Sequence, residues 1–125
     1  SIDQKMFNED LGMPGLISDR VMFLANLGKR NGVHGVVSSG HEVWRIKKRF
    51  RNTFFVATPG IRFETKGADR DQKRVVTPYT AAHEGSDLIV MSSDLIKGGP
   101  SAADRAVDEI YRGRLSKIYR DYWRD

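Results

Sequence analysis

The sequence contains no cysteine among its 125 residues, so a disulfide framework and a thiolate metal site are both excluded. It also lacks any apolar run approaching the roughly 18 residues of a membrane-spanning helix, and no secretory signal opens it. The lack of a long apolar run and of a secretory signal argues against membrane insertion and export. We therefore expect the protein in the cytoplasm, without a membrane partner.

The chain does have an excess of positive charge, with 21 lysines and arginines against 16 aspartates and glutamates. A basic surface favours anionic ligands such as phosphates, nucleotides or nucleic acid, but it says nothing about the fold. The length and the 39% hydrophobic content are typical of one small globular domain, so we expect residues 1–125 to form a single domain. The chain begins with Ser1 and not with Met, and we interpret this start as a cut end.

Short apolar strands alternate with helical segments along the chain. The pattern predicts strands at residues 33–39, 53–57 and 86–92, and helices at residues 3–10, 19–30, 41–50, 78–84 and 102–123. Helix starts are marked by Ser18, by Ser39 with Glu42, by Thr77 with Pro78, and by Ser101. This alternation predicts an α/β fold with a parallel sheet covered by helices.

Ligands of parallel α/β folds bind beyond the carboxyl ends of the strands. Here those positions are residues 38–40, 58–74 and 92–99, and the middle segment is the long polar connection TPGIRFETKGADRDQKR. Three strands alone make a narrow sheet whose two open edges invite pairing with another chain. Either the strands form a small three-layer sheet, or they are part of something larger.

Four segments together resemble orotidine 5'-phosphate decarboxylase: HGVVSS (34–39), VATPGIR (56–62), DQKRVVTP (71–78) and AHEGSDLIVM (82–91). The resemblance runs from Ser1 to about Ile110, in order and with matching gaps. Members of this family fold as a (β/α)8 barrel, which needs about 250 residues, and are usually dimers. The resemblance thus implies a partial TIM barrel made of strands six to eight with their helices. It also implies the conversion of orotidylate to UMP in pyrimidine biosynthesis, without a cofactor.

The resemblance assigns the long connection to the nucleotide's phosphate. Arg62 matches the arginine of the PGIR motif, and Gln72 matches the glutamine that reaches across the phosphate toward the base. A planar guanidinium can bind phosphate through two hydrogen bonds, and backbone N–H groups around Pro59 and Gly60 can add donors. Ser1 matches a serine that hydrogen-bonds the pyrimidine.

The chain departs from the family pattern in two places. The charged lysine and aspartate network that performs the family's catalysis comes from the early strands and has no counterpart here, so no catalytic residue is assigned. The family's eighth strand ends in a Gly-Arg pair that holds the phosphate, whereas the matching residues here are Ser92 and Ser93. Their hydroxyl and N–H groups remain possible phosphate ligands, and Lys97 or Arg62 is a candidate to replace the lost charge.

Two functions follow from these observations. One is the C-terminal part of an orotidine 5'-phosphate decarboxylase, active once an N-terminal barrel section is supplied. The alternative is an inactive half-barrel remnant, or a phosphate- or nucleotide-binding protein that self-associates. The expected partners are a phosphorylated pyrimidine nucleotide and either the N-terminal barrel section or another copy of the chain.

Other polar features favour structural roles. His41 and His83 are expected to be helix residues and not acid–base groups, and His34 has no carboxylate or thiol partner at a suitable spacing, so no metal site is expected. The basic run 45–51 reads as the solvent face of a helix more than as a nucleic-acid patch, so nucleic acid is not an expected partner. Arg62 and Gln72 as ordinary solvated loop residues stay open as an alternative. The apolar stripe of the last helix predicts packing within a barrel, with a subunit contact as the alternative.

Overall fold

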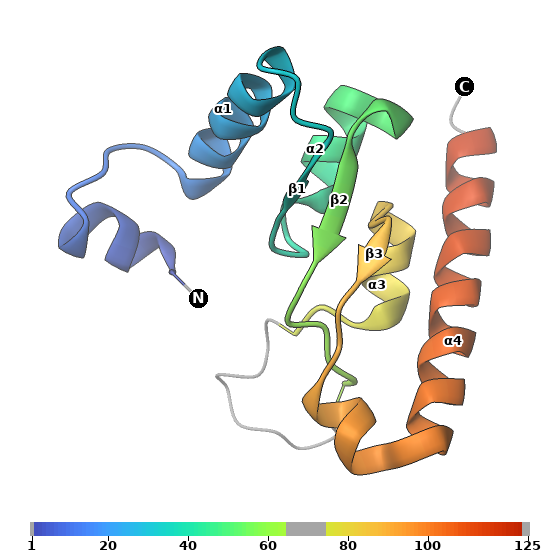
Figure 1. Ribbon diagram of the computed structural model, residues 1–125. Coiled ribbons are helices and arrows are strands. Elements are labelled where there is room, and N and C mark those ends of the chain that lie inside the picture. The colour runs from blue at the N-terminus through green and yellow to red at the C-terminus, as the bar shows by residue number, and fades with distance from the viewer. Residues whose placement is uncertain (1, 65–74, 124–125) are drawn as a thin grey trace.

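The computed structural model of the protein describes residues 2–64 and 75–123 (Figure 1). Strands and helices alternate as predicted. In chain order, the elements are η1, a π-helix (Met6–Asp10), α1 (Ile17–Arg30), β1 (Gly35–Val37), α2 (Val43–Phe50), η2, a 3₁₀ helix (Arg51–Thr53), β2 (Phe55–Thr58), α3 (Pro78–Glu84), β3 (Leu88–Ile89) and α4 (Ser93–Tyr122). No helix in these described ranges is both long and apolar enough to cross a membrane.

The three strands form one parallel sheet in the order β1-β2-β3. The register pairs Val36 with Val56, and Thr58 with Ile89. Helices α2 and α3 connect successive strands and lie behind the sheet in the view of Figure 1. The prediction of a parallel α/β arrangement is confirmed.

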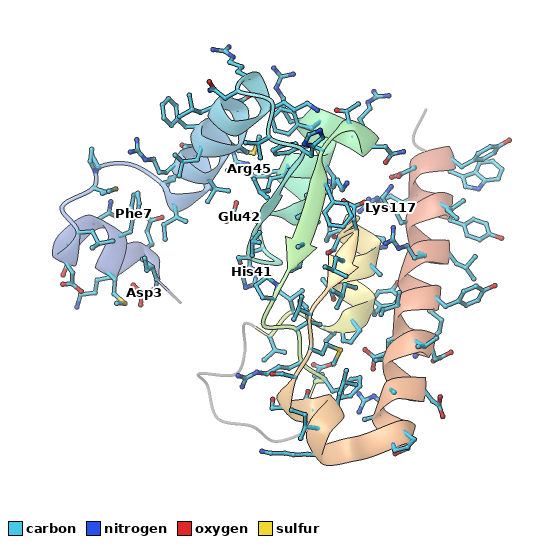
Figure 2. All side chains as sticks on the ribbon, viewed as in Figure 1. Asp3, Phe7, His41, Glu42, Arg45 and Lys117 are labelled. Atoms are coloured by element: carbon cyan, nitrogen blue, oxygen red, sulfur yellow. The ribbon has the colours of Figure 1, made fainter. Side chains whose placement is uncertain are left out.

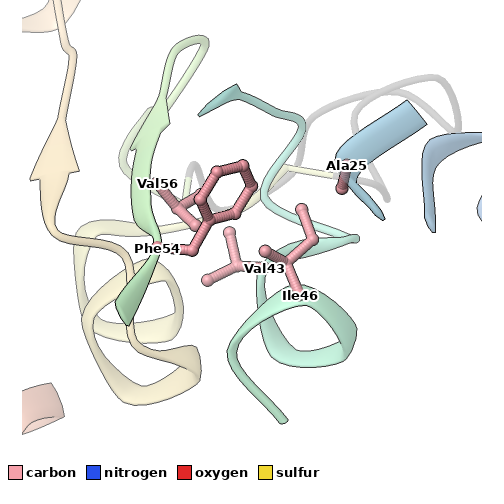
Figure 3. Packing of buried hydrophobic residues seen from close by; sticks show 5 residues of the cluster. All are labelled: Ala25, Val43, Ile46, Phe54 and Val56. Carbon is pink, nitrogen blue, oxygen red and sulfur yellow. The ribbon is translucent and has the colours of Figure 1, made fainter. Parts of the chain in front are cut away.

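The main core fills the space between α1, α2 and one face of the sheet (Figure 3). Phe54 immediately precedes β2, and Val56 lies within it. Both side chains contact Val43 and Ile46 of α2. These four side chains are completely buried, and Ala25 of α1 closes the cluster with 2% exposure. Burial of this apolar area is the main force that fixes α2 against the sheet.

The opposite face of the sheet carries apolar side chains without a cover. Because side chains alternate along a strand, Val37, Phe55, Leu88 and Val90 lie on the face opposite to Val56. Their exposed fractions are 76%, 49%, 50% and 45%. We call these four residues the uncovered sheet face.

Helix α4 packs along α3 through a close approach of the two backbones. A Cβ on Gly113 would lie 2.3 Å from the Tyr79 carbonyl oxygen and 3.0 Å from the Ala82 Cβ, so only glycine permits this contact. Figure 2 shows side chains leaving α4 on the side away from the sheet. The expected apolar stripe lies among the exposed residues, with Tyr111 63%, Ile118 62% and Tyr122 77% exposed.

The predicted start and end of α3 are confirmed. The Thr77 hydroxyl accepts a hydrogen bond from the Thr80 N–H at 3.1 Å, and Pro78 is the first helical residue. The helix ends at Gly85, whose φ of 100° is the left-handed conformation that glycine adopts without strain.

Two other predicted caps are wrong. Helix α1 begins after Leu16, so Ser18 lies inside its first turn. Helix α2 begins after Glu42, and the Ser39 hydroxyl accepts from the His41 N–H at 3.4 Å instead of from a helix N–H. Before α2, residues 40–42 form a turn, so the helix begins later than a cap at Ser39 would require.

The predicted last helix is present, but a short helical segment that was not predicted precedes it, and Ser101 is not its cap. Helix α4 begins at Ser93 and is interrupted at Gly99, whose φ of 60° and ψ of −149° are not helical. The Ser101 hydroxyl donates to the Gly98 carbonyl at 3.1 Å and does not cap the helix. Two helical segments therefore meet at Gly99, and the second begins close to the predicted residue 102.

Candidate functional site

The carboxyl ends of the three strands lie at one edge of the sheet, the lower edge in Figure 1. This is the edge at which parallel α/β folds bind their ligands. Residues 38–42 leave β1 there, and Figure 2 shows His41 and Glu42 in this segment. Residues 59–64 leave β2, and residues 90–92 leave β3.

The chain turns at Pro59 and Gly60 directly after β2. Gly60 has a φ of 74°, and a Cβ built there would have no heavy atom within 4 Å. The left-handed backbone, not crowding, therefore favours glycine at this position. The next side chain, Ile61, is 2% exposed and anchors the turn in a second core cluster, which contains Ile61, Val76, Ala81, Ile89 and Met91.

The backbone that follows this turn is fixed by three consecutive N–H groups. Ile61 donates to the Val90 carbonyl (3.4 Å), Arg62 to the Val76 carbonyl (3.2 Å) and Phe63 to the Asp94 carboxylate (2.7 Å). Two of these acceptors follow β3, so the segment after β2 is attached to the segment after β3. A buried side chain on one side and bonded N–H groups on the other leave this backbone little freedom.

Arg62 projects from this fixed backbone. Its side chain is exposed, and its guanidinium has no hydrogen bond or ion pair in the part of the chain that the structure describes. A guanidinium presents five N–H donors in a planar arrangement that matches a phosphate. Among the described residues, Arg62 thus offers an exposed guanidinium with which an anionic ligand can pair.

Ser92 and Ser93 stand at the same edge, where α4 begins after β3. Ser92 is exposed and occupies the N-cap position, and no side chain caps this helix start. Since β2 and β3 are neighbours in the sheet, the structure brings these two serines to the edge that carries Pro59, Gly60 and Arg62. The predicted residues Gln72 and Ser1 lie outside the described residues.

Lys97 follows Ser93 by four residues in the first part of α4. It lines a shallow cavity of about 440 Å³ next to the interruption of α4, and Arg62, Ser92 and Ser93 are not part of that lining. The lining consists of Phe63, Glu64, Asp94, Lys97, Gly98, Ser101, Ala102 and Arg105. That Lys97 replaces the charge of the arginine in the family's Gly-Arg pair stays a prediction.

The opposite edge of the sheet holds a charged groove of about 700 Å³ between α2, α3 and α4. Its cations are largely engaged, since Lys47 pairs with Asp87, and Arg120 pairs with Glu84 at 3.6 Å. Figure 2 shows Lys117 on the side of α4 that faces this groove, where it pairs with Asp121. This edge therefore has the character of a structural salt-bridge network.

Residues 2–64 and 75–123 contain no cluster of three or more carboxylate or imidazole side chains that could hold a metal ion. The Arg62 guanidinium and the hydroxyls of Ser92 and Ser93 at the carboxyl edge are instead hydrogen-bond donors. Such a set is suited to an anion.

The sequence profile of the "Orotidine 5'-phosphate decarboxylase / HUMPS family" matches residues 1–106. The chain belongs to this family. It is 40% identical over 99 residues to the orotidine 5'-phosphate decarboxylase of Novosphingobium aromaticivorans, a match covering 78% of this chain and 43% of the relative. The corresponding protein of Heliobacterium modesticaldum is 34% identical over 116 residues, covering 90% of this chain and 47% of the relative. The chain thus spans less than half the length of these curated relatives.

The solved structures show the same likeness. The crystal structure of orotidine 5'-phosphate decarboxylase from Lactobacillus acidophilus matches this chain with a TM-score of 0.67 and 23% sequence identity. The match covers 87% of this chain and 44% of the other. At that identity the likeness establishes the fold, so the chain is an α/β portion of a (β/α)8 TIM barrel.

Asp94, Arg105 and Glu109 were missed by the interpretation of the sequence. Arg105 and Glu109 stand four residues apart on a helix, which is a readable ion-pair spacing. Nothing local indicated that Asp94 and Arg105 would both reach Phe63, because that contact depends on the path of α4 after β3.

Proposed function

We propose that this chain is the C-terminal part of an orotidine 5'-phosphate decarboxylase and supplies the phosphate grip of the complete enzyme. The observation that carries the proposal is Arg62, an available guanidinium on a fixed backbone at the carboxyl edge of the sheet. Membership of the family supports the assignment. On this proposal strands β1, β2 and β3 are strands six, seven and eight of the barrel.

The proposed reaction breaks the bond between the ring and its carboxylate in orotidylate. Carbon dioxide leaves, the electron pair stays on the ring carbon, and a lysine in the remainder of the barrel gives that carbon a proton. Catalysis then requires stabilisation of the developing negative charge by groups fixed before the reaction. Binding of the distant phosphate lowers the barrier because remote binding energy can hold the substrate in the reactive geometry.

Within this scheme, Arg62 binds the phosphate through two N–H groups. The backbone around Gly60 and the hydroxyl and N–H groups of Ser92 and Ser93 complete the phosphate's ligands. Gln72 and Ser1 keep the contacts that the resemblance implies, to the phosphate and base and to the pyrimidine. No cofactor takes part.

The uncovered sheet face supports an N-terminal barrel section as the partner. The interior of a (β/α)8 barrel is filled with side chains from all strands, so a partial sheet leaves its inner residues exposed. Phe55 and Leu88, about half exposed here, are large apolar residues of this kind. A second copy of this chain could also cover the face, which is the observation that favours the alternative of a self-associating, inactive half-barrel.

The test is complementation of the chain by an N-terminal section. We would co-express it with the portion of the Heliobacterium modesticaldum relative that it does not match, record the native mass spectrum, and follow orotidylate loss by absorbance. The proposal expects a two-chain complex that turns over orotidylate. A folded two-chain complex without turnover, or a homo-oligomer that binds UMP, would favour the alternative.

Two matched variants sharpen this test. Phe55→Ser on the uncovered sheet face is expected to abolish the complex and its activity. Trp44→Ser, a change at an aromatic residue that is 38% exposed on the outer side of α2, is expected to leave both unchanged. Equal effects of the two changes would argue that the sheet face is not the contact surface.

A further inference from the structure

Phe63 is held from two sides by residues of α4. The Asp94 carboxylate accepts a hydrogen bond from the Phe63 N–H at 2.7 Å. The Arg105 guanidinium carbon lies 4.1 Å from the centre of the Phe63 ring, within the range of a cation–π contact. Asp94 lies in the first turn of α4 and Arg105 lies beyond its interruption at Gly99, so the kink brings both to the same residue.

Arg105 is itself oriented by a buried carboxylate. Its Nε donates to Glu109 at 2.9 Å, and the Glu109 side chain is only 12% exposed. A buried carboxylate requires a charged or hydrogen-bonding partner, so this pair is expected to be persistent. This hydrogen bond helps to hold the half-exposed guanidinium over the Phe63 ring.

We propose that Phe63, Asp94, Arg105 and Glu109 form a clamp that positions Arg62 for the phosphate. The role of the clamp rests on the proposed function, in which Arg62 is the phosphate ligand. Arg62 lies between buried Ile61 and clamped Phe63, so its backbone cannot turn the side chain away from the edge. Asp94 and Arg105 are positioning residues, because they act on Arg62 through Phe63 and not on the nucleotide.

The clamp has a second consequence for the site. It joins the segment after β2 to the helix after β3, the two segments assigned to the phosphate. Ordering a flexible arginine at the moment of binding costs affinity, and an arginine held beforehand avoids much of that cost. The clamp therefore increases phosphate affinity without a contact of its own.

The clamp is tested first without any ligand. Amide hydrogen exchange of the full chain, followed by NMR, is expected to show a protected Phe63 N–H that loses protection in Asp94→Ala. Asp94→Asn keeps an acceptor oxygen and is expected to retain most of the protection. Asp104→Ala, an exposed carboxylate on the same helix, is the matched control. Unchanged exchange of Phe63 in Asp94→Ala overturns the clamp.

The second test measures affinity for UMP and for uridine by titration of the chain together with its N-terminal section. Arg62→Ala is expected to weaken UMP binding about 10- to 100-fold, as for the loss of hydrogen bonds to a charged group, and to leave uridine binding unchanged. Asp94→Ala and Arg105→Ala are expected to weaken UMP binding about threefold to tenfold, the scale of a contact worth roughly 1 kcal/mol. Arg105→Lys keeps the charge but not the planar stacking, and is expected to behave like Arg105→Ala.

A double-mutant cycle separates positioning from direct contact. If Asp94 and Arg105 act through Arg62, each substitution has no further effect on UMP binding in the Arg62→Ala background. If Arg105 instead binds the phosphate from the shallow cavity, its effect adds to that of Arg62→Ala, and the clamp is overturned. If Arg62→Ala leaves the affinity for UMP unchanged, the proposed function is refuted. In that case the hydrogen exchange of the Phe63 N–H still decides whether the clamp exists.

Discussion

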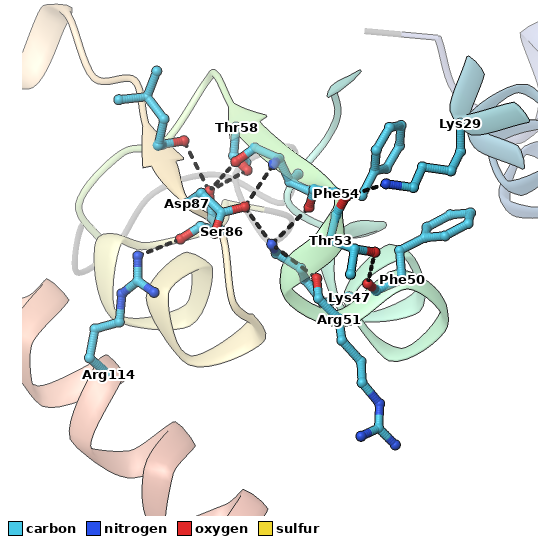
Figure 4. Close-up of polar contacts among 12 residues, drawn as sticks. Lys29, Lys47, Phe50, Arg51, Thr53, Phe54, Thr58, Ser86, Asp87 and Arg114 are labelled. Atoms are coloured by element: carbon cyan, nitrogen blue, oxygen red, sulfur yellow. Dashed lines mark hydrogen bonds and ion pairs between the residues drawn. The ribbon is translucent and has the colours of Figure 1, made fainter. Parts of the chain in front are cut away.

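Asp87 is the polar residue whose removal has the most predictable effect on the fold (Figure 4). Its carboxylate pairs with Lys47 of α2 and accepts the Val56 N–H of β2 at 2.8 Å. The Lys47 ammonium also donates to the Phe54 carbonyl at 3.0 Å, and its side chain is only 10% exposed. Asp87, itself just before β3, thus joins a helix and two strands.

Asp87→Ala removes two partners at once. The Val56 N–H loses its acceptor, which costs about 1–3 kcal/mol for a buried donor. Breaking a buried ion pair from one side costs about 3–5 kcal/mol, and the 27% exposure of Asp87 reduces this because water can reach Lys47. We therefore expect the free energy of unfolding to fall by about 2–4 kcal/mol, less than the sum of the two costs.

The assay is urea denaturation followed by circular dichroism, with Asp108→Ala as the control. Asp108 pairs with Arg112 on the exposed side of α4, so its loss is expected to cost less than about 1 kcal/mol. Asp87→Asn retains an acceptor for Val56 and should recover part of the stability. If Asp87→Ala costs no more than the control, the buried character of the Lys47 pair is refuted. If Asp87→Asn costs as much as Asp87→Ala, the Val56 contribution is refuted.

Three further changes have expected outcomes. Phe54→Ala removes a completely buried ring and leaves a cavity in the core. The free energy of unfolding is therefore expected to fall by about 3–5 kcal/mol in the same urea assay. Gly113→Val places a side chain against the Tyr79 carbonyl and forces α4 away from α3, so a fall in the melting temperature corresponding to at least about 2 kcal/mol is expected. Lys117 donates a hydrogen bond to Asp121 and, with Arg120, holds the pKa of that carboxyl below its usual 3.8. Because the folded-state pKa is lowered, the stabilisation is present at neutral pH and is lost as the pH falls through that pKa. Asp121→Asn should therefore lower the free energy of unfolding by less than about 1 kcal/mol at neutral pH, as for an exposed pair, with a slightly lower melting temperature. In strong acid the substitution should leave the melting temperature unchanged. A melting-temperature difference that persists in acid would contradict this cause.

Much of the architecture follows from local signals in the sequence. Short apolar runs separated by capped helices were sufficient to predict a parallel sheet, and Thr77 with Pro78 located the start of α3. The helical segment before Gly99 was not predicted, because the glycines before Pro100 were interpreted as a loop that precedes the last helix. Whether Gly99 ends a helix or only kinks it depends on packing around it, which local sequence does not encode.

The site was predictable where it depended on strand order. The carboxyl ends of neighbouring strands must meet at one edge, so Arg62 and the serines after β3 could be placed together from the sequence. The contacts of Phe63 were not predictable in this way. Its partner Asp94 is 31 residues away, and the position of Arg105 depends on the kink at Gly99.

The order of the strands in the sheet is also their order in the chain, and this has a consequence for folding. Each strand pairs with the next one along the sequence, but the partners Gly35 and Phe55 are 20 residues apart, and Ala57 and Leu88 are 31 apart. Each parallel pairing therefore requires closure of a crossover, which is slower than closure of a hairpin. Among the described residues, the outer edges of β1 and β3 have no neighbouring strand, so each can pair with an extended peptide. The solubility of the chain therefore depends on how soon another strand, such as one from the proposed N-terminal section, pairs with these edges.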